Sequence, residues 1–203
     1  TCALPIYINT ASWEGHAFVT PDGNSLYFAS NRPGGSGGMD IYVSKKNSIG
    51  DWLKPKNLGS SVNTQYNEIA PWLDPDEERL YFSSKGYPGM GGHDIFQSIA
   101  GQDGKWSKPM NMGYPINDAE DDYHFRVSSS ADTAWFSSLR GGSTEKREVY
   151  MMLNIPDNAE LLALNQLIDE AYKFKVEFET SALNEQEEEE TMDPEYSGTM
   201  DNE

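Results

Sequence analysis

Five acidic and imidazole side chains recur at one spacing and are the first candidates for chemistry in this chain. Glu14, Glu68 and Asp122 follow one another at intervals of 54 residues, and His16 and His124 each stand two positions after an acid. Side chains two positions apart on a strand project to the same face, so each acid is expected beside its histidine. Carboxylates hold cations and polar ligands, and imidazole is a frequent metal ligand.

These five residues are therefore candidates for binding at one mouth of a central channel. If the repeats curve around an axis, the acids form an arc there, and two acid–histidine pairs facing each other would make a metal site. In the alternative, the carboxylates bond to loop amides or pair across repeat junctions, and the histidines are hydrogen-bonded residues that line the channel. Because an acid stands in every repeat, the structural role is favoured, and no metal is predicted.

Two acidic stretches have a superficial likeness to calcium loops, Asp74 to Glu78 and residues 118–122. Arg79 stands where an EF-hand loop needs glycine, and Lys85 stands where it needs its last glutamate, which disfavours calcium. The sequence also lacks a nucleophile elbow, a zinc-protease helix motif, a P-loop and a dinucleotide fingerprint. We therefore expect a protein that is not an enzyme and that needs no cofactor.

The spacing of 54 extends to residues of other kinds and indicates a repeat fold. The further residues that keep it include Asn9, Asn63, Asn117, Tyr27, Tyr81 and Trp135. A period of this size marks supersecondary units that bury their apolar faces against one another. Each unit shows four strand signals separated by turns, which is the plan of a β-propeller blade. We predict an all-β fold over residues 1–153, with about three four-stranded antiparallel blades (units 9–62, 63–116 and 117–153) of a longer propeller.

Six more repeat-equivalent residues are predicted to build the blades. They are Asp40, Asp94, Arg32, Arg140, Trp52 and Trp106. The two aspartates follow glycine-rich loops and are expected to accept backbone N–H bonds there. The arginines are expected to bridge blades, and the tryptophans to pack between blades, with sugar stacking as the alternative for the tryptophans.

The turn Pro21-Asp22-Gly23 and the strand Leu26-Tyr27-Phe28 carry a family resemblance. With their counterparts at 75–76 and 80–82, they resemble the Pro-Asp-Gly repeats of TolB-type, WD-repeat-like β-propellers. Glu77 replaces the glycine in the second repeat, and Ser129-Ser130-Ala131 has lost the turn signature. The following Asp-Ile-Tyr/Phe and Trp-x-x-Pro-x-Asn-Leu/Met-Gly patterns are most similar to repeats of OmpA-family, peptidoglycan-associated outer-membrane proteins of Bacteroidetes-type bacteria.

That resemblance covers roughly residues 3–153 and has implications for location and partners. It implies a periplasmic protein associated with the outer membrane, whose partners are other envelope proteins or peptidoglycan. The expected function is a non-catalytic scaffold or binding module. The alternatives are a carbohydrate- or metal-binding propeller that uses the channel-mouth acids, and an accessory propeller of a hydrolase whose catalytic domain lies outside this chain.

The last quarter of the sequence has a different character. Leu161, Leu164 and Ile168 recur at steps of three or four, which predicts an amphipathic helix over residues 154–180 that docks on the propeller, leads to another domain or binds a partner. Residues 181–203 contain a run of four glutamates and are predicted to be a disordered acidic tail.

Charge and cysteine content exclude some classes of protein. The net charge of −18 argues against binding to a phosphate backbone, so nucleic acid is not an expected partner. No apolar run is long enough for a transmembrane helix. The single cysteine, Cys2, excludes a disulfide within the chain.

Overall fold

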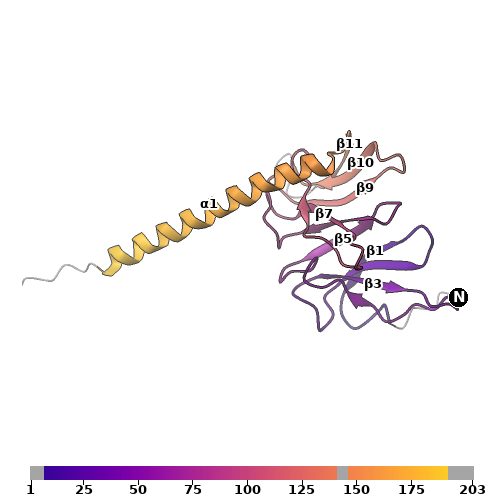
Figure 1. The fold of residues 1–203 in the computed structure, drawn as a ribbon. Coiled ribbons are helices and arrows are strands. Elements are labelled where there is room, and N and C mark those ends of the chain that lie inside the picture. The colour runs from indigo at the N-terminus through magenta and orange to yellow at the C-terminus, as the bar shows by residue number, and fades with distance from the viewer. Residues whose placement is uncertain (1–6, 141–145, 192–203) are drawn as a thin grey trace, which may run out of the picture. The chain divides into compact units, whose positions relative to one another are not determined.

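The computed structural model describes residues 7–140 and 146–191. Within these ranges, eleven strands form three antiparallel sheets, and one helix follows them in the chain. The sheets succeed one another in chain order, from the strands labelled β1 and β3 to those labelled β9, β10 and β11 (Figure 1). We refer to them as blades 1, 2 and 3.

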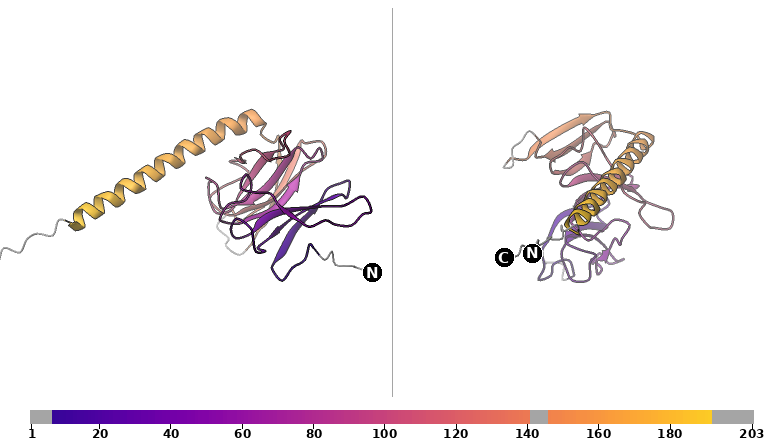
Figure 2. Two further views of the ribbon diagram at one scale, coloured as in Figure 1. Left: turned by 60° about the horizontal axis from the view of Figure 1, so that its bottom comes forward. Right: turned by 90° about the vertical axis from the view of Figure 1, so that its left-hand side faces the viewer.

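Each blade is a meander in which neighbours in sequence are neighbours in space. Blade 1 contains β1 (Glu14–Val19), β2 (Ser25–Ser30), β3 (Asp40–Lys45) and β4 (Lys56–Asn57). Blade 2 contains β5 (Glu68–Leu73), β6 (Arg79–Ser84), β7 (Asp94–Ile99) and β8 (Met110–Asn111). Blade 3 contains β9 (Asp122–Val127), β10 (Thr133–Ser138) and β11 (Glu148–Leu153). The first strands contact across blades, β1 with β5 and β5 with β9, so they lie side by side at the centre of the three sheets. Figure 2 shows the ribbon from two further directions.

The blades are joined by apolar side chains from facing sheets. Because successive strand residues point to opposite faces, a strand between two blades must be apolar or small on both faces. β2 and β6 meet this demand, and every residue of β2 is buried. Tyr27 and Ile41 of blade 1 pack with Leu80 and Phe82 of blade 2 in one cluster. An equivalent cluster joins blade 2 to blade 3, and each fully buried side chain of this kind stabilises the fold by about 1.5–3 kcal/mol.

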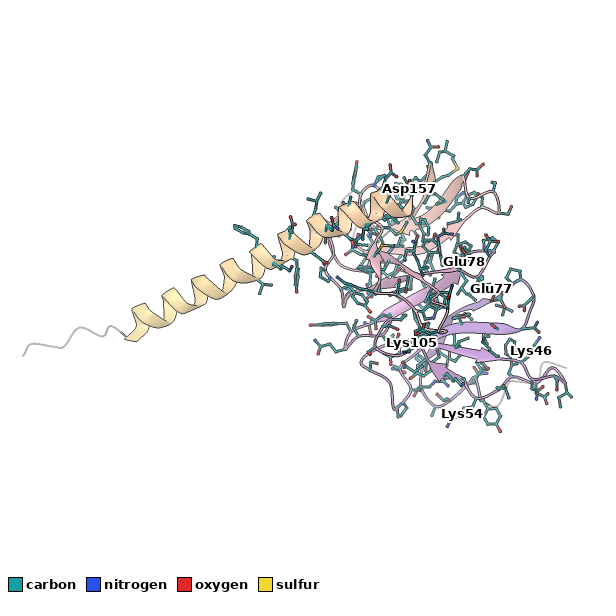
Figure 3. The ribbon with its side chains drawn as sticks, viewed as in Figure 1. Lys46, Lys54, Glu77, Glu78, Lys105 and Asp157 are labelled. Atoms are coloured by element: carbon teal, nitrogen blue, oxygen red, sulfur yellow. The ribbon has the colours of Figure 1, made fainter. Side chains whose placement is uncertain are left out.

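Blade 3 departs from the prediction of four strands. Among the described residues it has three, because the positions that the repeat would assign to a fourth strand lie in helix α1 (Asn158–Thr191). Asp157, labelled at the start of the helix in Figure 3, accepts bonds from the amides of Ala159 and Glu160 at 2.8 and 2.9 Å. Glu160 in turn accepts from the Asp157 amide at 3.0 Å, which completes a capping box and commits the chain to a helix.

The helix is also longer than predicted, since it runs to Thr191 instead of ending at residue 180. The stretch 181–191 was expected to be disordered, but its Glu, Gln, Ala and Leu residues are strong helix formers. Repulsion between like charges four residues apart costs only a few tenths of a kcal/mol per pair. The rest of the predicted tail, residues 192–203, lies outside the described residues.

The chain divides into two compact units, residues 1–165 and 166–203. The first turns of α1 belong to the first unit. There, Leu161 is fully buried in the cluster that joins blades 2 and 3. The Asn165 side chain accepts from the Asn111 amide at 2.6 Å and donates to the Asn111 carbonyl at 2.8 Å, so the start of the helix covers the outer edge of blade 2.

Candidate binding site at the channel mouth

The three repeat acids are occupied by hydrogen bonds within their own blades. The fully buried Glu68 accepts from the amide and hydroxyl of Thr64 at 2.8 and 2.7 Å and from the Ser84 hydroxyl at 2.7 Å. Glu14 accepts equivalent bonds from Thr10 and Ser30. Burial raises the pKa of Glu68 above its ordinary value. These carboxylates therefore hold the start of each central strand to the loop before it.

An arginine completes this anchor in blades 1 and 3. Arg140 donates to the buried Asp122 at 2.9 Å and to the carbonyls of Pro115 and Ile116, both at 2.6 Å. Pro115 and Ile116 lie on the connection from blade 2, so this arginine ties that connection to the acid of blade 3. Arg32 makes the same type of contacts in blade 1, with the Ile8 carbonyl at 2.7 Å and Glu14 at 3.2 Å.

Blade 2 has Gly86 where the other blades have this arginine. A Cβ at Gly86 would collide with the side chain of Thr64, which binds Glu68, so this position leaves no space for a side chain. Glu68 is held there by hydroxyl and amide donors, without an arginine among its described partners.

The other repeat-equivalent residues also lie inside the blades. Asp94 accepts from the amides of Met90 and Gly91 in its glycine-rich loop, at 3.0 and 3.3 Å, and burial raises its pKa to about 6. Asp40 accepts from a loop amide and from the Asn57 side chain. Trp106 packs on the cluster shared by blades 1 and 2, whereas Trp52 packs on the core cluster of blade 1.

The first strand of each blade contains a β-bulge, and the bulges of β1 and β9 carry His16 and His124. The backbone is left-handed at His16, Ala70 and His124, with φ of 50°, 53° and 58°, and the strand register shifts beside each of them. Residues with a Cβ seldom adopt this conformation, and where they do they are often part of a functional site. A bulge re-aims a side chain that regular pairing would point elsewhere.

The bulges bring His16 and His124 into contact between blades 1 and 3. The Nε2 atom of His124 lies 3.3 Å from Nδ1 of His16, and the rings stack at 5.4 Å between centroids. Nδ1 of His124 lies 3.1 Å from the Ser137 hydroxyl, so both ring nitrogens of His124 have partners. The acids bond elsewhere, and among the described residues no group of three or more His, Cys, Asp or Glu side chains could hold a metal.

His93, which the sequence pattern did not single out, joins the same cluster. Its Nδ1 lies 3.1 Å from an Asp121 carboxylate oxygen and 3.0 Å from the Tyr123 hydroxyl. The Tyr123 ring packs between His93 and His124, with centroid distances of 5.0 and 6.1 Å. All three histidines of the chain thus join, with Tyr123, one cluster, which we call the channel mouth. One signal in the sequence could have found His93: it departs from the repeat, because the equivalent position in blade 1 is Met39.

A cleft of about 390 Å³ opens beside this cluster, over blades 1 and 2. Its lining residues are Trp13, His16, Asn31, Met39, Asn67, Ile69 and His93. Trp13 is half exposed, and its ring lies 5.5 Å from that of His16. Asn31 accepts from the Trp13 amide and Asn67 from the Met39 amide, both at 2.9 Å, so these asparagines are held in place. None of the lining residues is a carboxylate.

The electrostatics of the mouth keep its imidazoles neutral. Burial, together with the charges of His16, Arg126 and Arg147, lowers the pKa of His124 to about 4. Burial also lowers the pKa of His16 and of His93. The guanidinium of Arg147 lies 4.2 Å from the centre of the Tyr123 ring. At neutral pH the mouth therefore presents aromatic faces, neutral imidazoles, amides and a cation.

Comparison with solved structures identifies the architecture. A protein of Agrobacterium tumefaciens assigned as TolB matches with a TM-score of 0.51 and 21% identity, over 74% of this chain and 48% of that one. The chain has a TolB-like β-propeller fold. It spans about half the length of that structure.

A second solved structure gives no functional information. The α-L-arabinofuranosidase of Lactobacillus brevis matches with a TM-score of 0.43 and 13% identity, over 74% of this chain and 55% of that one, a level that carries no argument. No family model and no curated protein matches the chain. The relationship to OmpA-family proteins stays a prediction. In the described part of the chain, no helix is both long and apolar enough to cross a membrane.

Proposed function

We propose that this TolB-like propeller is a non-catalytic binding module of the cell envelope, and that the cleft at the channel mouth holds a polypeptide partner. The observation that carries the proposal is that the repeat acids and the histidines have different surroundings. The repeat acids accept hydrogen bonds inside the blades, whereas the three histidines, Trp13 and Tyr123 lie together at the channel mouth. Tryptophan, tyrosine and arginine are the residues that dominate protein-binding surfaces.

The geometry disfavours a catalytic role for the repeat acids and for His124. Glycoside hydrolysis generally needs two carboxyl groups on either side of the scissile bond. Glu14, Glu68 and Asp122 already accept bonds from their own blades, and no carboxylate lines the cleft. The half-buried, neutral His124 is bonded on both ring nitrogens, which leaves it poorly placed to relay a proton.

Location and partners complete the proposal. We place the protein in the periplasm, in association with the outer membrane, with other envelope proteins or peptidoglycan as partners. The TolB-like fold is compatible with this location, and the repeat resemblance to OmpA-family proteins supports it. A polypeptide partner is favoured over glycan because the cleft combines neutral hydrogen-bonding groups with a single half-exposed aromatic side chain.

Site-specific photo-crosslinking tests the proposal. Benzoylphenylalanine replaces Trp13 in the cleft, and in a matched control it replaces Tyr114, an exposed aromatic residue outside the cleft. Irradiation of cells that make the protein is expected to give polypeptide adducts at position 13 and none of the same mass at position 114. Equal labelling at both positions, adducts with glycan alone, or turnover of peptidoglycan by the purified protein would overturn it.

A further inference from the structure

A groove of about 460 Å³ lies at the outer edge of blades 1 and 2, away from the channel mouth. Val43, Leu58 and Trp106 line it and pack on the cluster that joins these two blades, so its floor is apolar. Lys56 and Lys105 line it as well. The groove lies between two blades that pack on each other within this chain, so its shape does not depend on what covers the other faces of the sheets.

The equivalent place between blades 2 and 3 is occupied by the start of helix α1. Leu161 is fully buried in the cluster that contains Met112, the counterpart of Leu58. The Asn165 side chain accepts from the Asn111 amide at 2.6 Å and donates to the Asn111 carbonyl at 2.8 Å. Blade 2 therefore holds a helix by an apolar contact and by two hydrogen bonds to the backbone of its edge strand.

A glycine beside each edge strand allows such a helix to come close. A Cβ at Gly113 would collide with the side chain of Leu164, which belongs to α1. At Gly59, the counterpart in blade 1, a Cβ would meet nothing within 4 Å. Both glycines have a left-handed backbone, with φ of 61° and 80°, a conformation that favours glycine. The same local backbone thus occurs on both blades, with a helix against one and open space against the other.

The edge strand of blade 1 also offers the backbone groups that hold α1 on blade 2. The Leu58 amide donates to the Ile41 carbonyl on β3 at 3.1 Å. Because the backbone groups of successive strand residues point to opposite sides, the amide and carbonyl of Asn57 face away from β3. In the described part of the chain these two groups have no hydrogen-bond partner, whereas their counterparts on Asn111 bind Asn165.

Two cations distinguish the groove on blade 1 from its counterpart. Lys56 and Lys105 are both exposed, and the repeat has Met110 and Ala159 at the equivalent positions. Lys105, labelled in Figure 3, lies 3.5 Å from Asp103 in an exposed pair. Among the described residues Lys56 has no ion-pair partner. Positive charge beside an apolar floor favours an occupant that is acidic as well as apolar.

We propose that this groove docks an acidic amphipathic helix of a partner protein, in the way that blade 2 holds the start of α1. The helix carries the pattern of Leu161, Leu164 and Asn165, because residues at these spacings share one face. Its leucines pack over Leu58, and its asparagine binds the backbone of Asn57. Helix α1 of a second copy is not the occupant, since its Leu161 is buried in its own chain. The inference does not depend on the function of the channel mouth.

Titration of the 203-residue chain with a helical peptide tests the proposal. The probe is a synthetic peptide of residues 156–171, which has the leucine and asparagine pattern, four acids and no basic residue. A lactam bridge between positions 163 and 167, both exposed in α1, keeps it helical, because short helices are marginal in water. Since α1 already occupies blade 2, the peptide should bind at blade 1 and shift the NMR amide signal of Asn57 but not that of Asn111.

Matched variants identify the contacts. In the peptide, Asn165→Ala should weaken binding by at least about fivefold, because two hydrogen bonds are lost, whereas Gln166→Ala should have little effect. In the chain, Lys56→Glu together with Lys105→Glu should weaken it by at least about tenfold. Lys54→Glu, which reverses an exposed lysine outside the groove, is the control and should change it by less than about twofold. Unchanged circular dichroism shows that the chain variants are folded.

Three results would overturn the proposal. The first is the absence of saturable binding at peptide concentrations up to about 1 mM. The second is a set of signal changes at Asn111 in place of Asn57, which would mean that the peptide replaces α1 on blade 2. The third is binding that the two lysine reversals leave unchanged.

Discussion

Blades 2 and 3 are built from the same repeat, yet their equivalent residues have different surroundings. Blade 2 packs against a sheet on each face, whereas blade 3 packs against a sheet on one face among the described residues. As a result, Ile95 is completely buried and Val149 is mostly exposed, although both occupy the same position on the third strand. The comparison teaches that a repeat residue acquires its role from the sheet that covers it as much as from its own type.

The largest expected difference comes from truncating this position in each blade. Ile95→Ala should lower the free energy of unfolding by about 2–5 kcal/mol, because it opens a cavity between blades 2 and 3. Val149→Ala should change it by less than about 0.5 kcal/mol in dilute solution, where an exposed side chain has little to lose. Urea unfolding of both variants measures the two values. Equal losses would show that the two blades do not differ in this way.

The asparagines that precede the blades give the next largest contrast. Asn117→Ala removes the two bonds to Ile95 and a third, at 2.8 Å, to the Asn111 side chain, all of them buried. The free energy of unfolding should fall by about 2–3 kcal/mol, because the freed backbone groups stay unsatisfied. Asn9→Ala, the same substitution ahead of blade 1, should stay within about 0.5 kcal/mol in dilute solution. A large effect of Asn9→Ala would contradict the comparison.

Substitutions in the first turn of a blade should have a smaller effect on the free energy of unfolding. Glu77, labelled in Figure 3, has φ of 57° at the position where blade 1 has Gly23 with φ of 73°. Glu77→Gly should raise the free energy of unfolding by about 1 kcal/mol, since glycine adopts this conformation without the strain of a Cβ. Gly23→Ala should lower it by a similar amount. Thermal unfolding measures both, and shifts of the same sign would refute the explanation.

The smallest predicted effect is on pH dependence at the mouth. The pKa of His124 is lowered from 6.5 to about 4, chiefly by burial, so the folded state resists a proton that the unfolded state accepts. The stabilising contribution is therefore present above pH 6.5 and is lost as the pH falls towards 4. Because the ring is partly open to solvent, we expect a loss below about 1 kcal/mol.

A matched variant isolates this contribution from that of the acids. Asp94 has the opposite effect on stability. Because its pKa in the folded state is raised to about 6, the folded protein binds this proton more readily than the unfolded chain does, and the free energy of unfolding rises as the pH falls. The stability of the wild type minus that of His124→Gln, measured by urea unfolding at pH 7 and pH 4.5, removes the effect of Asp94. A difference that stays constant between the two pH values would contradict the lowered pKa of His124.

Much of the blade plan follows from the sequence, because strand contents and turn residues repeat at one interval. The spacing alone predicted that His16 and His124 occupy equivalent strand positions, and in the structure they meet. The roles of His93 and Trp13 at the mouth could not be predicted, because neither belongs to a repeated set. Their positions depend on how the loops of two blades converge, which no local pattern encodes.

At the end of blade 3, the repeat predicted the wrong secondary structure. The repeat calls for a fourth strand at residues 160–167, whereas the local helical periodicity and the Asp157–Glu160 cap favour a helix. The local signal decided the structure there. A strand at that place would need the Trp-x-x-Pro-x-Asn pattern of the other units, and this stretch lacks it.

Amide hydrogen exchange tests most directly the claim that the covering sheet determines the role of each repeat position. The amides of Ile41, Ile95 and Val149 are equivalent, and asparagine side chains bind the first two. In dilute solution we expect slow exchange at Ile41 and Ile95 and exchange at Val149 that is faster by at least about a hundredfold. Exchange at Val149 as slow as at Ile95 under these conditions would contradict it.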